Sequence, residues 1–567
     1  MKNSFVIILL FISLAIIAEE RPRETRAVWV ATNFRLDWPP HTFNQAEQQN
    51  SLRRIFNNIN QKKLNTVYFQ ARSNGTVMFK SEIEPFSPYF TGQTDVPPDY
   101  DPLAFAIKEA HERGLEIHAW VNVFRCFTGT ETEALESPKH VFNKRPEWVV
   151  EAITGGKKTY WLDPGLPEVR NYLVDLFTEI ASNYDVDGIH LDFIRYPNKN
   201  IEDDFSYNLY GEGKPRDEWR RENITKFMKL LSERIRSIKP FVKIGVTPIG
   251  IYKNIKGAYG MQGFSSVYQD TREWLKLGYA DYAVPQVYWD IAENPKFKNL
   301  ALDWLSNSSG KNIVLGIAAY KPEVKKEIEE QIAFARNIGA AGEAFFRYGN
   351  IKDYVFSSFR ARAYPAGYKE IAETYPPPPE NLTVNIDRAG GKRVTLAWEK
   401  PRREGGNSVK YYALYVLSKS DEGTEKKNLF QIVGAERNAV TFSIEKPRRL
   451  KYYFAVKSVG QFWNESRESS NVVEFEPPQL KNLIDEINPV NAPLLVKEKN
   501  GYKLLLFSGR KEEIKVTAAA DGKNSIILIN LLLPGENIFT INNDLEGYDE
   551  IVISCENSGR IYKMKIK

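Results

Sequence analysis

Cysteine and histidine are scarce in this sequence, and their scarcity excludes several kinds of site. Only Cys126 and Cys555 occur among 567 residues, so a disulfide framework, a zinc ribbon and a multi-cysteine redox motif are excluded. The five histidines are scattered without metal-site spacing, which argues against the ligand set of a metal-dependent deacetylase. We therefore predict that the protein uses neither a metal nor another cofactor.

The sequence also has little excess of positive over negative charge. The net charge is only +5 and the basic residues are dispersed, so we predict no nucleic-acid partner and no membrane-binding patch. The sequence has neither a glycine-rich phosphate loop nor a serine in a Gly-x-Ser-x-Gly elbow. With 42% hydrophobic and 26% charged residues the composition is ordinary for a globular protein, and the length suggests about three domains.

Residues 1–18 have the pattern of a signal peptide. Lys2 precedes an apolar run from Phe5 to Ala18, and the charged residues 19–21 follow directly. The run is shorter than a membrane span, and an uncleaved membrane anchor is the alternative interpretation. Because no second apolar span follows, we predict an exported protein with no membrane span after signal cleavage. The lack of disulfides favours the periplasm or cell surface of a bacterium.

Residues 26–364 alternate between short β-rich runs and amphipathic helical patterns. Most of the runs are apolar throughout, as expected for strands covered on both sides. Eight such units predict a (β/α)₈ TIM barrel over residues 19–375, in the α/β class. The eight predicted strands are Ala27–Thr32, Thr66–Ala71, Glu116–Val121, Gly188–Phe193, Lys243–Thr247, Tyr282–Tyr288, Ile313–Ala318 and Glu343–Phe346.

The chain changes character after the proline run Pro376–Pro379, which predicts a stiff linker. Short strands with a period of two then predict an immunoglobulin-like β-sandwich over residues 376–476, similar to a fibronectin type III module. A second proline pair begins a predicted small β-domain over residues 477–567. Neither β-module shows a catalytic cluster, and an envelope protein is a possible partner for them.

The segment Asp187–Pro197 indicates where the chemistry lies. It predicts a buried strand that carries His190 and Asp192 on one face and ends close to Arg195. The same alternation on other strands turns further polar and aromatic side chains toward the carboxyl ends of the barrel, where barrel active sites lie. An inert polar layer is the alternative. The predicted substrate-binding residues are Gln70, Arg72, His118, Trp120, Asn122, His190, Arg195, Gln286, Tyr288 and Trp289.

Aromatic rings beside carboxylates suit sugars, because ring CH faces stack on aromatic groups while hydroxyls form hydrogen bonds. Cleavage of a glycoside usually needs two carboxyl groups. We predict Asp192 as the first, acting as nucleophile or general acid, with Asp290 or Asp37 as the second. Glu343 begins a strand and lies at the wrong end. Three further acids stay possible: Glu82, Glu84 and Asp163.

A resemblance to a known family rests on eight segments of the barrel: Arg26–Thr32, Leu36–Pro40, Tyr68–Arg72, Tyr100–Ala106, His118–Asn122, Leu162–Gly165, Asp187–Pro197 and Pro285–Trp289. In these segments the barrel resembles the glycosyl-hydrolase-like family 10 domain of bacterial envelope proteins. The resemblance implies cleavage of an amino-sugar polysaccharide, and a divisome-associated member acts on peptidoglycan glycan strands stripped of their peptides.

The sequence departs from this family at Phe193, where many members carry a second acidic residue. We expect Phe193 to point away from Asp192, toward the helical layer, since an acid would be costly to bury there. The rival interpretations are a non-catalytic glycan-binding pseudoenzyme and a purely structural envelope protein whose β-modules bind the partner.

Overall fold

The computed structural model describes residues 23–566, except for 129–131, 293, 368–374, 387–392, 402–407, 445–448, 478–492 and seven short stretches between 499 and 559. The predicted signal peptide lies outside the described residues. The chain divides into two compact units, residues 1–372 and 373–567. Among the residues described, no helix combines the length and apolarity that crossing a membrane requires.

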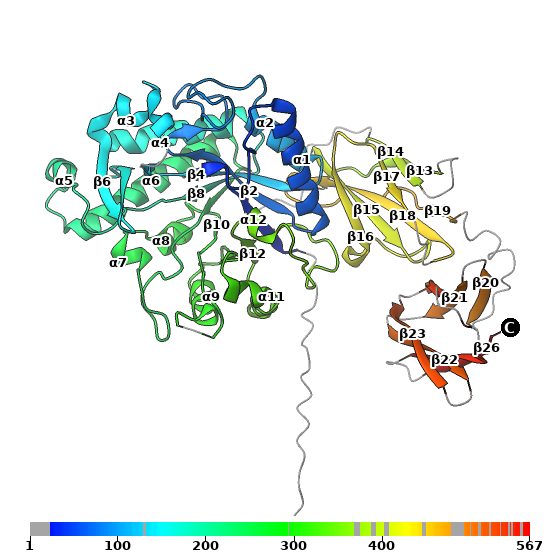
Figure 1. Cartoon of the computed structure of the whole chain (residues 1–567). Coiled ribbons are helices and arrows are strands. Elements are labelled where there is room, and N and C mark those ends of the chain that lie inside the picture. The colour runs from blue at the N-terminus through cyan, green and yellow to red at the C-terminus, as the bar shows by residue number, and fades with distance from the viewer. Residues whose placement is uncertain are drawn as a thin grey trace, which may run out of the picture. The chain divides into compact units, whose positions relative to one another are not determined.

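The first unit contains a closed barrel of eight parallel strands, as the sequence predicted. Neighbouring strands pair in the order β1, β2, β4, β8, β9, β10, β11 and β12, and β12 pairs again with β1. Figure 1 shows the strands surrounded by helices. The barrel strands are β1 (Thr25–Val30), β2 (Thr66–Ser73), β4 (Glu116–Asn122), β8 (Gly188–Asp192), β9 (Lys243–Val246), β10 (Tyr282–Ala283), β11 (Asn312–Ile317) and β12 (Gly342–Phe345).

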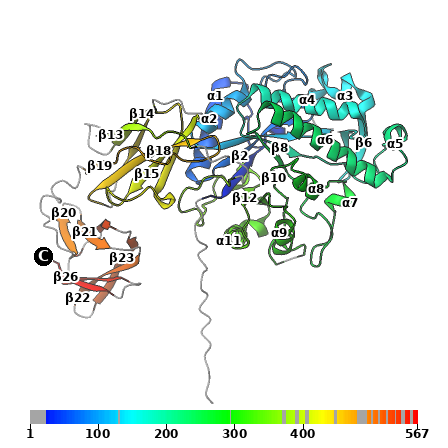
Figure 2. The ribbon, with the colours of Figure 1, turned by 180° about the vertical axis from the view of Figure 1, so that it is seen from behind.

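Helices cover the outside of the barrel with apolar stripes. In α4, residues Val169, Leu173 and Leu176 lie at three- and four-residue spacing and are fully buried. Figure 2 shows α4 and α6 beside β8. The helices are α1 (Gln45–Gln61), α2 (Pro102–His111), α3 (Val141–Lys144), α4 (Pro167–Asn183), α5 (Asp204–Tyr210), α6 (Arg216–Ile238), α7 (Gly263–Ser266), α8 (Thr271–Lys276), α9 (Phe297–Ser306), α10 (Pro322–Lys326), α11 (Ile328–Ile338) and α12 (Tyr348–Ile351).

An antiparallel sheet that the sequence analysis did not predict is inserted between β4 and α4. Its strands are β5 (Arg125–Phe127), β6 (Val149–Thr154) and β7 (Lys157–Leu162), with β7 in the middle. Gly155 and Gly156, both with positive φ, form the turn between β6 and β7. A further short strand, β3 (Thr76–Val77), pairs with the end of β2.

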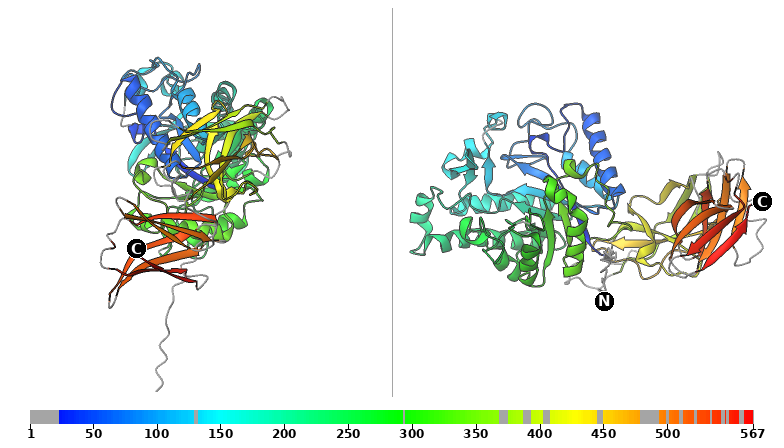
Figure 3. Two further views of the ribbon diagram at one scale, coloured as in Figure 1. Left: turned by 90° about the vertical axis from the view of Figure 1, so that its right-hand side faces the viewer. Right: turned by 60° about the horizontal axis from the view of Figure 1, so that its bottom comes forward.

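The second unit consists of antiparallel sheets, in agreement with the predicted β character. Its first part has sheets β13-β14-β17 and β16-β15-β18-β19, which share a core around Trp398 and Phe454. Its second part has sheets β20-β21-β24 and β23-β22-β25-β26, seen at the red end of the chain in Figure 3. The fibronectin type III assignment stays a prediction.

The strands of this unit are β13 (Glu380–Ile386), β14 (Arg393–Glu399), β15 (Val409–Leu417), β16 (Leu429–Gly434), β17 (Ala439–Ser443), β18 (Tyr452–Gly460), β19 (Val473–Phe475), β20 (Leu494–Glu498), β21 (Gly501–Ser508), β22 (Glu512–Ala520), β23 (Lys523–Leu532), β24 (Gly535–Ile541), β25 (Glu550–Cys555) and β26 (Ile561–Lys565).

Candidate active site

Asp192 is the last residue of β8 and lies at the carboxyl end of the barrel. Only 8% of the residue is exposed. The indole Nε1 of Trp120 donates to Oδ2 at 3.2 Å, and the amide of Phe193 donates to Oδ1 at 2.7 Å. Burial raises the pKa of the Asp192 carboxyl to about 6, although these donors and the positive charges of two nearby arginines oppose the rise. Asp192 can therefore hold or release a proton near neutral pH.

Asn122 and Tyr288 lie beside this carboxyl. Asn122 ends β4 directly opposite Asp192, is 4% exposed, and its Oδ1 has no hydrogen-bond partner among the described residues. A buried acceptor without a partner costs about 1–3 kcal/mol, which a donor on a bound ligand can recover. Burial and the negative charge of Asp192 raise the pKa of Tyr288 well above its usual range, so its hydroxyl stays protonated.

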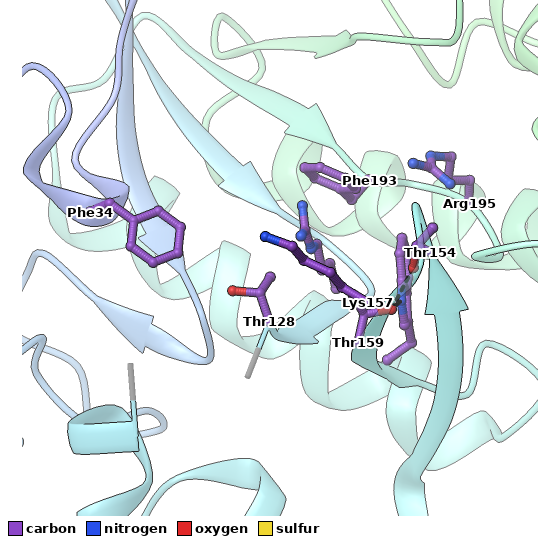
Figure 4. Close-up of a pocket in the computed structure, with 9 residues that line it drawn as sticks. Phe34, Thr128, Thr154, Lys157, Thr159, Phe193 and Arg195 are labelled. Atoms are coloured by element: carbon purple, nitrogen blue, oxygen red, sulfur yellow. Dashed lines mark hydrogen bonds between the residues drawn. The ribbon is translucent and has the colours of Figure 1, made fainter. Parts of the chain in front are cut away.

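A pocket of about 250 Å³ opens between the barrel and the inserted sheet (Figure 4). It adjoins Asp192 through Phe193, the next residue, and through Arg125 and Arg195, whose charges act on the Asp192 carboxyl. Phe193 lines the pocket, because this residue has φ of 51° and its chain leaves the strand direction directly after Asp192. Our expectation that Phe193 points into the helical layer is therefore wrong. The pocket is lined by Phe34, Arg125, Thr128, Thr154, Lys157, Thr159, Trp161, Phe193 and Arg195.

The predicted inward direction of Arg72 is also wrong. A β-bulge shifts the register between β2 and β4, so that Gln70 pairs with Trp120 but Arg72 pairs with Val121, a residue of the outer core. Arg72 is fully buried and forms a bidentate ion pair with Glu84, at 2.6 and 2.8 Å. Both groups hold the strand ends together and are turned away from solvent.

Gln70 and Asp37 anchor the loop that follows β1. The Gln70 Oε1 accepts from the amides of Thr32 and Asn33 at 3.0 and 2.9 Å. The Asp37 carboxylate has no exposed side-chain surface, and it accepts from the amides of residues 31 and 349 and pairs with Arg347. Burial raises the pKa of Asp37, while these donors oppose the rise. The anchored loop includes Phe34, which lines the pocket.

His118 and His190 lie in a fully packed layer inside the barrel, where the structure gives them internal partners in place of the predicted sugar contacts. Trp29 Nε1 donates to His190 Nε2 at 3.1 Å, and the Tyr282 hydroxyl contacts Nδ1 of His190 at 3.1 Å and Nδ1 of His118 at 2.6 Å. Burial lowers the pKa of His190 well below its usual range, so its ring is neutral. Its Nδ1 therefore carries the proton and donates to Tyr282, which can in turn donate to His118.

The remaining predicted residues follow β10, which is shorter than expected and ends at Ala283. Isolated bridges at Gln286 continue the pairing toward residues 249 and 316. Gln286, Trp289 and Asp290 are partly exposed, as a ligand contact requires. The Asp290 carbonyl accepts from the amide of Phe297 at 3.0 Å, where α9 begins. The substrate-binding and catalytic roles of these residues stay predictions.

Two further acids that the sequence analysis considered, Glu343 and Asp163, lie at other places in the barrel. Glu343 is the second residue of β12, at the entrance of that strand. Burial raises the pKa of Asp163 to about 6, and this residue holds the turn before α4 by accepting from the amide of Gly165 at 2.8 Å. Within the described part of the chain, no group of three or more His, Cys, Asp or Glu could hold a metal ion.

The inserted sheet contributes pocket residues that the sequence analysis did not identify, including Arg125 on β5 and Lys157 and Thr159 on β7. A usable signal was present. Two runs of about six residues flank a Gly-Gly pair, which is the pattern of a β-hairpin.

A closed parallel barrel with a buried carboxyl and an open pocket at the carboxyl ends of its strands is the arrangement of barrel enzymes. Comparison with protein families identifies the family of this barrel. The chain belongs to the family described as "Glycosyl hydrolase-like 10", whose model matches residues 24–334, more than half of the chain.

Curated proteins of two bacteria are similar to this chain in sequence. The chain is 29% identical over 494 residues to glycosyl hydrolase YngK of Bacillus subtilis, covering 80% of this chain and 94% of the relative. It is 31% identical over 340 residues to glycosyl hydrolase DigH of Escherichia coli, covering 55% of this chain and 76% of the relative. Among solved structures, the PgaB glycoside hydrolase domain of Bordetella bronchiseptica matches with a TM-score of 0.44 at 13% identity, covering 59% of this chain and 99% of that one.

Proposed function

We propose that the protein is a glycoside hydrolase that cleaves an amino-sugar-containing polysaccharide of the bacterial envelope, such as peptidoglycan glycan strands. The observation that carries the proposal is the carboxyl of Asp192, which is buried at a strand end, has a pKa raised to about 6 and lies beside the unpaired Oδ1 of Asn122. Family membership and the names of two relatives as glycosyl hydrolases support it. The signal-peptide pattern supports export.

The raised pKa favours general acid catalysis by Asp192. A carboxyl that keeps its proton near neutral pH can protonate the leaving glycosidic oxygen, as the acid of a glycosidase pair does. Asp290 is our preferred second carboxylate, because it follows β10 and is partly exposed, whereas the side chain of Asp37 has no exposed surface and holds the β1 loop. The Oδ1 of Asn122 would accept from an acetamido N–H or a sugar hydroxyl.

Phe193 supports a second candidate, a glycan-binding pseudoenzyme. The family resemblance implies an acid at this position in many members, and Phe193 instead lines the pocket as an apolar residue. In this alternative the same site holds a polysaccharide without cleaving it.

Product release from defined glycans distinguishes the glycoside hydrolase from the glycan-binding pseudoenzyme. The full-length protein is incubated with peptide-free peptidoglycan strands, chitin oligosaccharides and neutral glucans, and new reducing ends are measured with mass spectrometry of the products. We expect release from an N-acetylated glycan by the wild-type protein and none by Asp192→Asn. Tight binding with no products from any glycan would establish the pseudoenzyme instead.

The two β-modules are proposed to bind an envelope component, and the barrel is proposed to act alone. Residues 1–372 form one compact unit, and the described part of this unit has its own core. A protein limited to this unit should fold and retain the specific activity of the full chain. Loss of activity with retained folding would make the β-modules part of the catalytic unit.

A further inference from the structure

Three positively charged side chains line the pocket next to Asp192: Arg125, Lys157 and Arg195. From these we infer that the pocket is a subsite for a sugar residue that carries a carboxylate. The inference rests on the proposed function and narrows its amino-sugar-containing substrate to glycans that carry carboxylates.

The two arginines are held in place by aromatic rings, and the acid whose charge acts on both is Asp192. Arg125 lies over the ring of Phe193 at 4.7 Å, and Arg195 lies over Phe193 and Trp161 at 5.3 and 5.2 Å. Among the described residues, neither arginine forms a direct ion pair, and Lys157 forms none. The Arg195 Nη1 donates to the carbonyls of residues 196 and 197, at 3.3 and 3.5 Å. The rings and carbonyls therefore position the two guanidinium groups, and no carboxylate contacts them directly.

One hydrogen-bond donor of these arginines is buried without an acceptor among the described residues. The Nε of Arg125 is buried and has no hydrogen-bond partner among the described residues. Burial lowers the pKa of Arg125 and brings that of Arg195 down to about 10, so each remains charged at neutral pH. A buried charged donor without an acceptor is costly, and a bound anion would remove that cost.

Asp192 does not balance this charge. It is a single carboxyl with a raised pKa that keeps it partly protonated near neutral pH, and three cations line the adjoining pocket. Buried arginine in an enzyme pocket commonly binds a planar carboxylate through two parallel N–H donors. The ring of Phe34, on the left of the pocket in Figure 4, supplies an apolar face on which the CH face of a sugar can stack.

Two kinds of sugar supply such a carboxylate: an N-acetylated amino sugar with a free 3-O-lactyl group, and a hexuronic acid. The full-length Asp192→Asn protein allows binding to be measured by calorimetry without turnover. The probes are a peptide-free N-acetylglucosamine/lactyl-amino-sugar tetrasaccharide, the same compound with its carboxyls amidated, and an alternating hexuronate/N-acetylhexosamine tetrasaccharide.

We expect at least one acidic probe to bind about tenfold more tightly than the amidated probe, with a preference that weakens at high salt. The tighter acidic probe identifies the source of the carboxylate. Equal binding of the acidic and amidated tetrasaccharides, with no gain from the hexuronate, would overturn the inference while leaving the proposed hydrolysis intact.

Charge variants in the same background locate the subsite. Arg195→Gln should reduce the preference for the acidic probe by about tenfold, and Lys157→Gln, whose ammonium is exposed, by about threefold. Lys158→Gln is the matched control, because this neighbouring lysine pairs with Glu151 at 2.8 Å and does not line the pocket. An equal loss in Lys157→Gln and Lys158→Gln would show that general surface charge attracts the probe, and would contradict a dedicated subsite.

Discussion

Two layers of polar side chains, one inside the barrel and one at the carboxyl ends of its strands, differ in how completely their hydrogen bonds are satisfied. In the inner layer, both ring nitrogens of His118 and of His190 have a partner, and Tyr282 connects the two rings. In the outer layer, at the carboxyl ends of the strands, Asn122 Oδ1 and Arg125 Nε have none among the described residues. The sequence pattern alone makes the two layers look alike.

The difference indicates what each layer does. A satisfied buried network holds a unique arrangement of side chains and has no capacity left for a ligand. Gly245 contributes to that fit, since a Cβ there would lie 1.9 Å from Cζ of Tyr282. Unpaired groups beside a carboxyl with a raised pKa are instead costly in the free protein, and such groups are typical of functional sites. Substitutions should therefore affect stability in one layer and turnover in the other.

The largest effect is expected for Asp192→Asn. The change keeps the shape of the side chain but removes the proton that the carboxyl would donate, so kcat should fall by about 10³-fold or more. In the wild-type protein, activity should decline as the pH rises through about 6, because the acid form is lost there. Steady-state rates from pH 4 to 8 test both points. Wild-type turnover in Asp192→Asn would remove Asp192 from the mechanism, and activity that rises through pH 6 would make it a base or nucleophile.

The second effect separates the two candidate partner acids. Asp290→Asn should lower kcat by about 10²-fold without changing the melting temperature, because a catalytic carboxylate contributes chiefly to the transition state. Asp37→Asn should lower the melting temperature as well, since it weakens the ion pair with Arg347 that holds the β1 loop. Glu343→Gln is the comparison at the far end of the barrel. Equal losses of activity in Asp290→Asn and Glu343→Gln, both with reduced stability, would argue against Asp290 as the partner.

The third effect concerns the stability of the outer layer. The pKa of Asp192 in the folded protein, about 6, exceeds the ordinary value of 3.8 that applies to the unfolded chain. Between these pH values the folded protein binds more protons than the unfolded chain, so ionising Asp192 lowers stability as the pH rises from about 4 to about 6. The cost, fully present above pH 6, is about 2–3 kcal/mol.

Asp192→Asn removes this cost. The free energy of unfolding of the variant, relative to wild type, should therefore increase by that amount between pH 4 and pH 7, as measured by urea denaturation at each pH. Residues that titrate identically in both proteins cancel in the difference. A difference that stays constant with pH would show that the Asp192 carboxyl is well solvated.

Much of the barrel could be predicted from the sequence, because buried parallel strands read as apolar runs. Seven of the eight predicted strands match within about two residues at each end, and the alternation on β4 and β8 correctly turned Trp120, Asn122 and Asp192 to the same side. The exception is β10, which was predicted to extend to Tyr288 but ends at Ala283.

The errors in the site have local backbone causes. A bulge in β2 turns Arg72 outward, and the left-handed conformation of Phe193 turns its ring into the pocket. Neither event follows from alternation, since each adds or reverses one residue in an otherwise regular strand. Alternation also cannot tell how deep a side chain lies, so His118 and His190 were grouped with Asp192 although they belong to the inner layer.

The smallest effect compares matched tyrosines in the two layers. Tyr282→Phe removes the hydroxyl that contacts both histidines, so Nδ1 of each ring loses that partner. The free energy of unfolding should fall by about 1–3 kcal/mol, and kcat should change less than about twofold. Tyr288→Phe removes a hydroxyl near Asp192 and should leave stability within about 0.5 kcal/mol while raising KM or lowering kcat several-fold. Chemical denaturation and steady-state kinetics on the same preparations give both readouts. If Tyr282→Phe abolished turnover in a folded protein, the inner layer would have to take part in the reaction, and the division between the two layers would fail.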